Sequence, residues 1–336
     1  MNAAVRAVPD GLRTMTATRG DAGERLDLVI RRHLSDLPHA TRSRVQRWMR
    51  DGTVTVNGRP VARPAARAAH GDIIQVAVSG TPTRVVMRAE PSPLEVLFED
   101  EHILAVNKPP NVVVHPTYRH ATGTLMNGLL WRARNWPAGH RPSLVGRLDK
   151  LTSGIVVVAK TPRVHAALQR TLAQPVSEKA YLAVVYGKVT PTRGTIELRL
   201  ARAEADRRRM VASTSRGLAS VTRYERISRA AAPRAGVALL RCRLVTGRTH
   251  QIRVHLSARG WPIVGDPVYG EPRWSSVADA EVAAALRAFP RQALHAWGLA
   301  FPHPITGAPV RIQAPLPADF TNLLRASGLT PPEAYL

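Results

Sequence analysis

The stretch from Gly146 to Lys160 (GRLDKLTSGIVVVAK) constrains the fold of this chain more than any other part of the sequence. Its second half, Ile155 to Ala159, is an unbroken run of small and β-branched apolar residues, which predicts a strand buried on both faces. Thr152 to Gly154 supply hydrogen-bonding side chains and a flexible glycine, so a loop is expected at the start of that strand. Asp149 then lies beside a rigid element and is a candidate for chemistry. An acid that merely orders the turn is the alternative interpretation.

Charge and cysteine content narrow the class of protein. The 336 residues are enough for one large or two ordinary domains, and the formal net charge of +24 indicates a polyanionic partner, either nucleic acid or an anionic membrane. Most of the positive charge is arginine, whose planar donors suit phosphate. Cys242 is the single cysteine, which excludes disulfides and cysteine-cluster metal sites. No apolar run is long enough to span a bilayer, and the N-terminus lacks a secretory signal. We therefore expect a cytoplasmic protein without a membrane partner.

The first part of the chain predicts a small module over residues 18–80, after a loose tail over residues 1–17. Apolar residues recur at helical spacing from position 26 to 34 and again from 45 to 49, so two amphipathic helices are expected, the second capped by Thr41. Asn57-Gly58 is a strong hairpin signal, and a further strand is expected after Gly71-Asp72.

The second helix is unusually basic. A single arginine there would be interpreted as part of a solvated face, but four within nine residues favour contact with a nucleic acid backbone. These residues are Arg42, Arg44, Arg47 and Arg50. With Arg25-Leu26-Asp27, Thr41 to Arg44, Gly52, Val56-Asn57-Gly58 and Gly71-Asp72 in this order, the module resembles the alpha-L RNA-binding motif. The resemblance implies that the basic helix binds RNA, with Arg42, Arg44 and Arg47 as candidate contacts.

A second domain is expected over residues 94–325, after a linker over residues 81–93 that contains proline and glycine. A buried strand is expected to end in the stretch NKPPNVVVHP, which contains Lys108 and His115. These two side chains could contact RNA or could equally serve as polar residues at strand ends. The loop from Asp206 to Met210 is expected to be a phosphate-facing hairpin tip.

Two further stretches place polar side chains on rigid elements. Lys179 and Tyr181 are two residues apart in a predicted strand and therefore share a face. Thr246 to Leu256 (TGRTHQIRVHL) predicts a turn and then a helix capped by Thr249, from which Arg253 can point inward. The sequence contains no HExxH pattern, phosphate-binding loop or dinucleotide fingerprint attached to a βαβ unit, so we expect neither a metal site nor a cofactor.

These stretches together resemble the RluA-type family of RNA pseudouridine synthases. The family pattern is matched by GRLDKLTSG, NKPPNVVVHP, the K-x-Y at Lys179, and TGRTHQIRVHL. The sequence departs from it at Gly146, where histidine is usual, and at Leu151, where an acid is common. The resemblance implies an α+β protein: a small N-terminal alpha-L RNA-binding module and a mixed α/β catalytic domain on a large, mostly antiparallel sheet.

The same resemblance implies the roles of the site residues. Asp149 is the expected nucleophile, Arg253 is its ion-pair partner, and Tyr181 stacks on the uracil and is a candidate to take a proton from it. The expected substrate-binding residues of this domain are Arg147, Lys179, Arg248, His250 and Gln251. Gly265 to Gly270 and Arg291 to Ala296 also fit the family and are interpreted as a structural turn and the lead-in to a strand.

The expected reaction explains why these residue types are needed. Pseudouridine forms when the bond from ribose to the ring nitrogen breaks, the uracil turns, and the ring is rejoined through carbon five. This requires an ionised carboxylate, a cation that keeps it ionised, an aromatic wall and a weak base, but no cofactor. The expected substrate is folded RNA, either large-subunit ribosomal RNA or its assembly intermediate, bound by a monomer.

Two other classes of protein were weighed against this prediction. A non-catalytic RNA-binding or ribosome-assembly protein would explain the charge but leaves Asp149, Tyr181 and Arg253 without a function. A glycosidase normally requires two opposed carboxylates, and the stretches above supply Asp149 alone as a clear acid.

Overall fold

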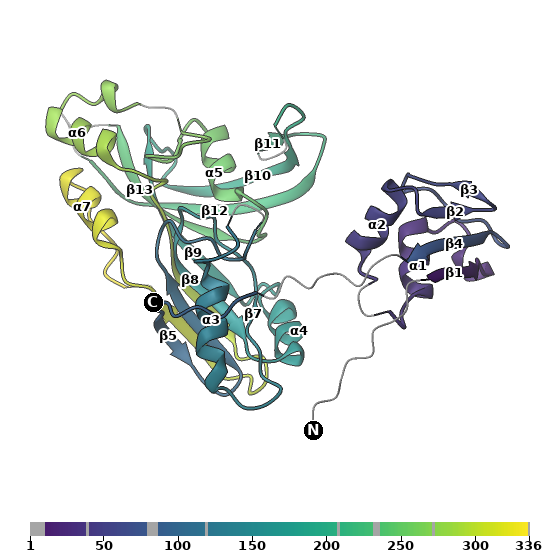
Figure 1. The fold of residues 1–336 in the computed structure, drawn as a ribbon. Coiled ribbons are helices and arrows are strands. Elements are labelled where there is room, and N and C mark those ends of the chain that lie inside the picture. The colour runs from purple at the N-terminus through teal and green to yellow at the C-terminus, as the bar shows by residue number, and fades with distance from the viewer. Residues whose placement is uncertain are drawn as a thin grey trace. The chain divides into compact units, whose positions relative to one another are not determined.

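The computed structural model describes residues 11–37, 40–78, 87–117, 120–206, 209–230, 236–270 and 273–334. The chain divides into two compact units, residues 1–86 and 87–336, and each is described by itself (Figure 1). Residues 87–93 were expected in a linker, but they belong to the second unit: Met87 packs against an apolar cluster, and the N–H of Glu90 donates to the carbonyl oxygen of Asn127 (3.1 Å). The rest of the expected linker, residues 81–86, lies outside the described residues.

The first unit packs two helices against one face of a small antiparallel sheet. Its helices are α1 (Leu26–His33) and α2 (Arg42–Arg50), and its strands are β1 (Gly11–Thr16), β2 (Val54–Val56), β3 (Arg59–Pro60) and β4 (Ile73–Val78), in the order β1-β4-β2-β3. The buried apolar core includes Val29, Ile30, Val45, Met49 and Ile74. Both predicted helices are confirmed, as is the hairpin at Asn57-Gly58, where both residues have the positive φ of a type I′ turn.

The expected loose tail is wrong for residues 11–16, which form β1. All six residues pair with β4, from Gly11 opposite Val78 to Thr16 opposite Ile73. The side chains of β1 are mostly exposed, so the strand has no apolar alternation that the sequence could reveal. Backbone hydrogen bonds to the edge of β4 define it. Residues 1–10 lie outside the described residues.

The second unit is built on one large sheet. The strand order is β11-β10-β12-β13-β9-β14-β8-β6-β5, with β15 paired to β14 and β7 paired to β8. The strands are β5 (Glu95–Glu99), β6 (Ile103–Lys108), β7 (Ser143–Leu144), β8 (Ser153–Ala159), β9 (Glu178–Tyr186), β10 (Arg193–Arg202), β11 (Met210–Ser213), β12 (Leu218–Arg229), β13 (Val237–Leu244), β14 (Leu294–Pro302) and β15 (Pro309–Gln313). Most neighbours are antiparallel, which confirms the expected architecture, and β8 and β14 pair in parallel.

Helices cover this sheet and bury its central strands. They are α3 (Leu125–Arg132), α4 (Pro162–Thr171), α5 (Gln251–Ala258), α6 (Ala280–Ala288) and α7 (Ala318–Ala326). Apolar side chains of α3 and α4 pack against opposite-facing residues of β6 and β8, so β8 is buried throughout, as predicted. The sequence analysis did not anticipate α3, α6, β5 or β15. Short 3-10 turns occur at Arg19–Asp21, Ala133–Asn135 and Trp274–Ser276.

The parallel contact between β8 and β14 depends on Gly154. This residue lies opposite Ala296 and has a φ of +111°, which favours glycine. A Cβ atom at this position would lie 2.1 Å from the carbonyl oxygen of Ala296, so no other residue fits without separating the strands. Because the Asp149 loop leads directly into β8, this close approach also fixes where that loop begins.

Candidate active site

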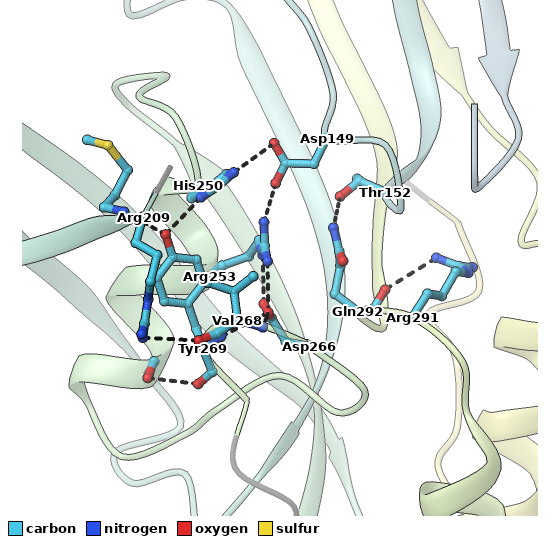
Figure 2. A network of polar contacts seen from close by, with 12 residues as sticks. Asp149, Thr152, Arg209, His250, Arg253, Asp266, Val268, Tyr269, Arg291 and Gln292 are labelled. Carbon is cyan, nitrogen blue, oxygen red and sulfur yellow. Dashed lines mark hydrogen bonds and ion pairs between the residues drawn. The ribbon is translucent and has the colours of Figure 1, made fainter. Parts of the chain in front are cut away.

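The loop that carries Asp149 is held by residues at the start of β14. The N–H of Thr152 donates to the carbonyl oxygen of Asp149 (3.1 Å), which closes a tight turn. The side-chain amide of Gln292 donates to the Thr152 hydroxyl (3.0 Å), as Figure 2 shows. The Ser153 hydroxyl lies 2.9 Å from Nδ1 of His295. These contacts fit the predicted structural role of Arg291 to Ala296 and make the loop a rigid support for its carboxylate.

Lys108 supports the same loop from the end of β6. Its side chain is fully buried, and Nζ donates to the carbonyl oxygens of Pro109 (2.8 Å), Val112 (3.0 Å) and Lys150 (3.1 Å). Burial, with the nearby positive charge of Arg291, lowers the pKa of Lys108 to about 7. Of the two interpretations of Lys108, the structure therefore supports the strand-end role and not RNA contact.

Arg253 projects from α5 toward Asp149, as the sequence analysis expects. Its Nη1 donates to Oδ2 of Asp149 at 2.8 Å, across more than a hundred residues of sequence. Its Nε and Nη2 donate to the two carboxylate oxygens of Asp266 at 2.6 and 2.8 Å (Figure 2). The ring of Tyr269 lies against the guanidinium, 4.9 Å from its central carbon. Asp266 thus binds Nε and Nη2 of Arg253, and Nη1 is left to donate to Asp149.

The buried cation is stabilised by the two carboxylates. Burial alone would lower the pKa of Arg253, but the hydrogen bonds and charge of Asp266, followed by those of Asp149, outweigh it and raise this pKa. For Asp266, the hydrogen bonds and charge of Arg253 outweigh burial and lower the pKa. The side chain of Arg253 is 5% exposed and that of Asp149 is 24% exposed. The guanidinium is therefore permanently charged, and the carboxylate it holds still reaches solvent.

His250 faces the second oxygen of Asp149. Its Nε2 lies 3.6 Å from Oδ1 of Asp149, and its Nδ1 lies 2.8 Å from the Tyr269 hydroxyl. That hydroxyl accepts a hydrogen bond from the N–H of Met210 (2.8 Å), so its own proton is available to donate to Nδ1. Burial lowers the pKa of His250, against the opposing charge of Asp149. If Nδ1 accepts this hydrogen bond, the proton of the neutral ring lies on Nε2, the nitrogen that faces Asp149.

The start of α5 differs from the prediction. His250 occupies the N-cap position with a left-handed φ of +56°, and its side chain makes no capping hydrogen bond. The expected cap at Thr249 is wrong, because the Thr249 hydroxyl instead accepts a hydrogen bond from Arg147 (3.1 Å). This hydrogen bond connects the Asp149 loop to the turn before α5.

Gln251 orders that turn from inside. It is buried, and its side-chain oxygen accepts from the Thr246 hydroxyl (2.8 Å) and the N–H of Arg248 (3.0 Å). Its side-chain nitrogen donates to the carbonyl oxygen of Val221 and to the hydroxyl of Thr222. With its amide fully used inside the protein, Gln251 is placed to position the turn, whereas the sequence analysis expected it to bind RNA.

A cavity of about 600 Å³ opens above these residues. Asp149, Arg253, His250, Tyr181 and Lys179 all line it. Burial, with the negative charge of Asp149, raises the pKa of Tyr181 to about 12. Lys179 donates to the carbonyl oxygen of Leu172 (2.7 Å), and burial lowers its pKa. The expected catalytic residues thus share one cavity, with a neutral phenol in its wall.

Arg147 and Arg248 lie at the rim of this cavity and are exposed. In the first unit, Arg42 and Arg47 of α2 are also exposed, and Arg44 lies over the Trp48 ring (5.6 Å). Arg42 also donates to the buried carboxylate of Asp27 (3.0 Å). Contact between these five arginines and RNA stays a prediction.

Asp266 and Tyr269 are the site residues that the sequence analysis missed. They belong to Gly265 to Gly270, which was interpreted as a structural turn. Oδ1 of Asp266 does accept hydrogen bonds from the N–H groups of Val268 (2.9 Å) and Tyr269 (3.0 Å), as in an ordinary turn. The same carboxylate also holds Arg253, so one side chain orders the turn and supports the site.

The β10–β11 hairpin reaches the same network. Arg209 donates to the carbonyl oxygen of Val268 (3.2 Å), so this residue packs on the site. Arg207 and Arg208, the other arginines of the predicted phosphate-facing tip, lie outside the described residues. Within the described ranges, no group of three or more His, Cys, Asp or Glu residues is arranged to hold a metal ion, and no helix is long and apolar enough to cross a membrane.

Known proteins resemble this chain over both units. Residues 102–258 match the family model described as RNA pseudouridylate synthase, and residues 24–74 match the S4 domain. Ribosomal large subunit pseudouridine synthase D of Xanthomonas campestris is 40% identical, covering 94% of this chain and 92% of the relative. The synthase D of Pseudomonas aeruginosa is also 40% identical (90% and 91% covered). An uncharacterized RNA pseudouridine synthase of Bacillus subtilis, YlyB, is 38% identical (92% and 96%).

Solved structures also resemble this chain. Human RNA pseudouridylate synthase domain containing 1 has a TM-score of 0.52 at 27% identity and covers 72% of this chain and 98% of its own. Human RNA pseudouridylate synthase domain containing 4 has a TM-score of 0.56 at 23% identity, covering 71% and 95%, and supports the fold alone.

Proposed function

The chain belongs to the RluA-type family of RNA pseudouridine synthases with an N-terminal S4 domain, and we propose that it uses Asp149 to convert uridines of large-subunit ribosomal RNA to pseudouridine. The observation that carries the proposed site is the ion pair between Asp149 and Arg253 (2.8 Å), which lies in a cavity also lined by Tyr181. The proposed substrate follows from the relatives of Xanthomonas campestris and Pseudomonas aeruginosa, which are named as large-subunit enzymes.

Asp149 is suited to act as the nucleophile because its two oxygens have different surroundings. Oδ2 is fixed by Arg253, whereas Oδ1 faces Nε2 of His250 across 3.6 Å. Arg253 orients Asp149 through this hydrogen bond, while Asp266 prevents Arg253 from turning away.

The reaction is an isomerisation and needs no external oxidant or reductant. The bond between ribose C1′ and ring N1 breaks, the uracil turns, and a bond forms between C1′ and C5. The proton lost from C5 is balanced by one gained at N1. Asp149 supplies negative charge to the separated sugar or forms a bond with the substrate that is later released.

Tyr181 is proposed to hold the detached uracil. Its raised pKa of about 12 makes it a neutral phenol at neutral pH, which is suited to stacking and not to accepting a proton from C5. We therefore assign it the role of an aromatic wall. Arg147 and Arg248, at the cavity rim, are proposed to bind the backbone of the RNA, as are Arg42, Arg44 and Arg47 of the N-terminal module. We further propose that the protein acts in the cytoplasm as a monomer.

The direct test uses the purified protein and three RNAs: large-subunit ribosomal RNA, small-subunit ribosomal RNA and transfer RNA. Pseudouridines are then mapped by position in each. Conversion at a few positions of the large-subunit RNA alone is the expected result. Conversion confined to another RNA would refute the proposed substrate. RNA binding with no conversion in any of them, or in isolated large-subunit particles, would favour the non-catalytic alternative.

A further inference from the structure

Four arginines gather on one face of strands β10, β12 and β13. Strand register aligns them in two rows: Thr195, Arg223 and Arg243 in one, and Arg193, Glu225 and Arg241 in the other. A hollow of about 330 Å³ lies among these side chains. We call these six residues the arginine face.

The arginine face lies on the side of the sheet opposite to Tyr181. Cys242 pairs with Tyr181, and its neighbours Arg241 and Arg243 therefore point to the other side of the sheet. Helix α5 packs on the Cys242 side, where Ile252 joins the same apolar cluster. The arginine face is thus separate from the cavity that contains Asp149.

Two of the four arginines have uncompensated charge. Arg241 pairs with Glu225 (2.5 Å), and Arg243 pairs with Glu178 (2.8 Å). Arg193 and Arg223 are exposed and make no ion pair with any residue in the described part of the chain. One further acid, Glu197, lies on the same face in the row beyond Thr195.

Arg223 lies directly opposite Arg243 on the neighbouring strand, and like charges in this position destabilise a sheet. The ion pair between Arg243 and Glu178 offsets part of this repulsion, but Arg223 has no such partner among the described residues. No acid occupies their row, since the third position is Thr195. A bound anion would relieve the remaining repulsion, and both arginines line the hollow, where they offer planar donors that phosphate oxygens accept.

We propose that the arginine face binds backbone phosphates of a second segment of the same RNA whose target uridine enters the cavity. This inference rests on the proposed function for the identity of the RNA. A ribosomal RNA is long enough to reach both sides of the sheet, and the net charge of +24 favours a polyanion over a protein partner. Because phosphate contacts position RNA without reading its sequence, the arginine face adds affinity and not base specificity.

The test compares a long and a short RNA. Arg193→Gln with Arg223→Gln removes the two uncompensated charges and leaves both ion pairs intact. The control, Arg287→Gln with Arg325→Gln, removes the same charge from exposed positions on α6 and α7. Affinity and turnover are measured with a large-subunit RNA fragment of several hundred nucleotides and with a short stem-loop that contains the target uridine.

The arginine-face variant should bind the long RNA about 5- to 10-fold more weakly at physiological salt. Its plot of log affinity against log salt should be shallower by about 1.5, as expected for two lost phosphate contacts. Its kcat on both RNAs and its KM for the short RNA should match those of the unchanged protein. The control variant should show a smaller loss of affinity for the long RNA and, like the arginine-face variant, an unchanged KM for the short one.

Four outcomes would overturn the proposal. Unchanged affinity for the long RNA would remove the arginine face as an RNA site, as would a loss equal to that of the control variant. Reduced turnover on the short RNA would show that the two arginines act on the cavity or the fold. Weaker binding to large-subunit particles with unchanged affinity for naked RNA would assign the face to a protein partner. If the unchanged protein converts no RNA, the proposed function fails, but the affinity comparison still decides the role of this face.

Discussion

The tripeptide Arg-Leu-Asp occurs in both units of this chain, and its aspartate has opposite surroundings in each. Asp27 is fully buried in the first unit and accepts hydrogen bonds from its neighbour Arg25 (3.0 Å), from Arg42 (3.0 Å) and from Gln46 (2.6 Å). Asp149 remains 24% exposed, and Arg253, far away in the sequence, is its guanidinium partner.

The arginine of each tripeptide explains the difference. Arg25 turns back onto Asp27, whereas Arg147 reaches outward to Thr249 and leaves Asp149 to a guanidinium from α5. Four hydrogen bonds from three side chains use up the acceptor capacity of Asp27, so this carboxylate holds two helices together and is closed to a substrate. Asp149 keeps one oxygen toward a cavity. The tripeptide alone therefore does not identify a candidate catalytic acid. The two aspartates differ in where the arginine that pairs with each of them lies in the chain.

The largest expected effect is that of Asp149→Asn. The amide cannot act as a nucleophile, so turnover should fall by roughly 10⁴-fold or more, while RNA affinity stays within about twofold. The measurement is the release of tritium from RNA labelled at C5 of uridine, with a filter-binding assay in parallel. A variant that keeps more than about a hundredth of the activity would contradict the proposed role of Asp149.

Asp266→Asn should have the next largest effect. The amide can still accept the turn hydrogen bonds, but Arg253 loses its bidentate partner and can turn away from Asp149. We expect kcat to fall by about 100-fold, with little change in KM, since the geometry of the nucleophile changes and the RNA contacts do not. A rise in KM without a loss of kcat would place Asp266 outside the catalytic network.

Asp27→Asn should separate stability from chemistry. Removing one partner of a buried ion pair destabilises a protein by about 3 kcal/mol, here reduced because Arg25 and Arg42 are partly solvated. The free energy of unfolding of the first unit, followed in the full chain by urea titration, should fall by about 2–3 kcal/mol. Turnover of a short RNA should remain within about twofold, and a large loss there would break the contrast between the two aspartates.

The same contrast predicts an acid-sensitive first unit. Burial opposes ionisation of Asp27 and Asp21, but the hydrogen bonds they accept outweigh it and hold both pKa values well below the usual value near 4. Their stabilising contribution is therefore fully present above about pH 4 and is lost as the pH falls below it. Thermal melts between pH 7 and pH 3 should show this loss, and Asp27→Asn should make the pH dependence less steep.

The sequence predicted those parts of the fold whose pattern is local. β8 is a continuous apolar run, and α1 and α2 have clear helical spacing. By contrast, α3 (LMNGLLWR) is apolar on most sides because it is buried from Leu125 to Leu129, so it shows little amphipathic pattern. β1 has the reverse problem, since its exposed side chains show no pattern and only pairing with β4 defines it.

The site was predictable to the extent that family resemblance reached it. Asp149, Arg253 and Tyr181 lie in matching stretches, and the structure brings them to one cavity. Periodicity alone could not pair Asp149 with Arg253, because their contact depends on how the strands between them are ordered. Asp266 was missed because an aspartate before proline is a common turn residue, and its local hydrogen bonds conceal its distant one.

The crossing of β8 and β14 has a consequence for how this sequence can vary. With the carbonyl oxygen of Ala296 where the first side-chain carbon would lie, Gly154 leaves no room for even a methyl group. If every amino acid were tried at this position and active clones were selected, glycine should be the sole survivor. The neighbouring residues, Ser153 and Ile155, both have a side chain. Gly154 has only a hydrogen atom in that place, and of the three positions it is the one that the enzyme can least replace.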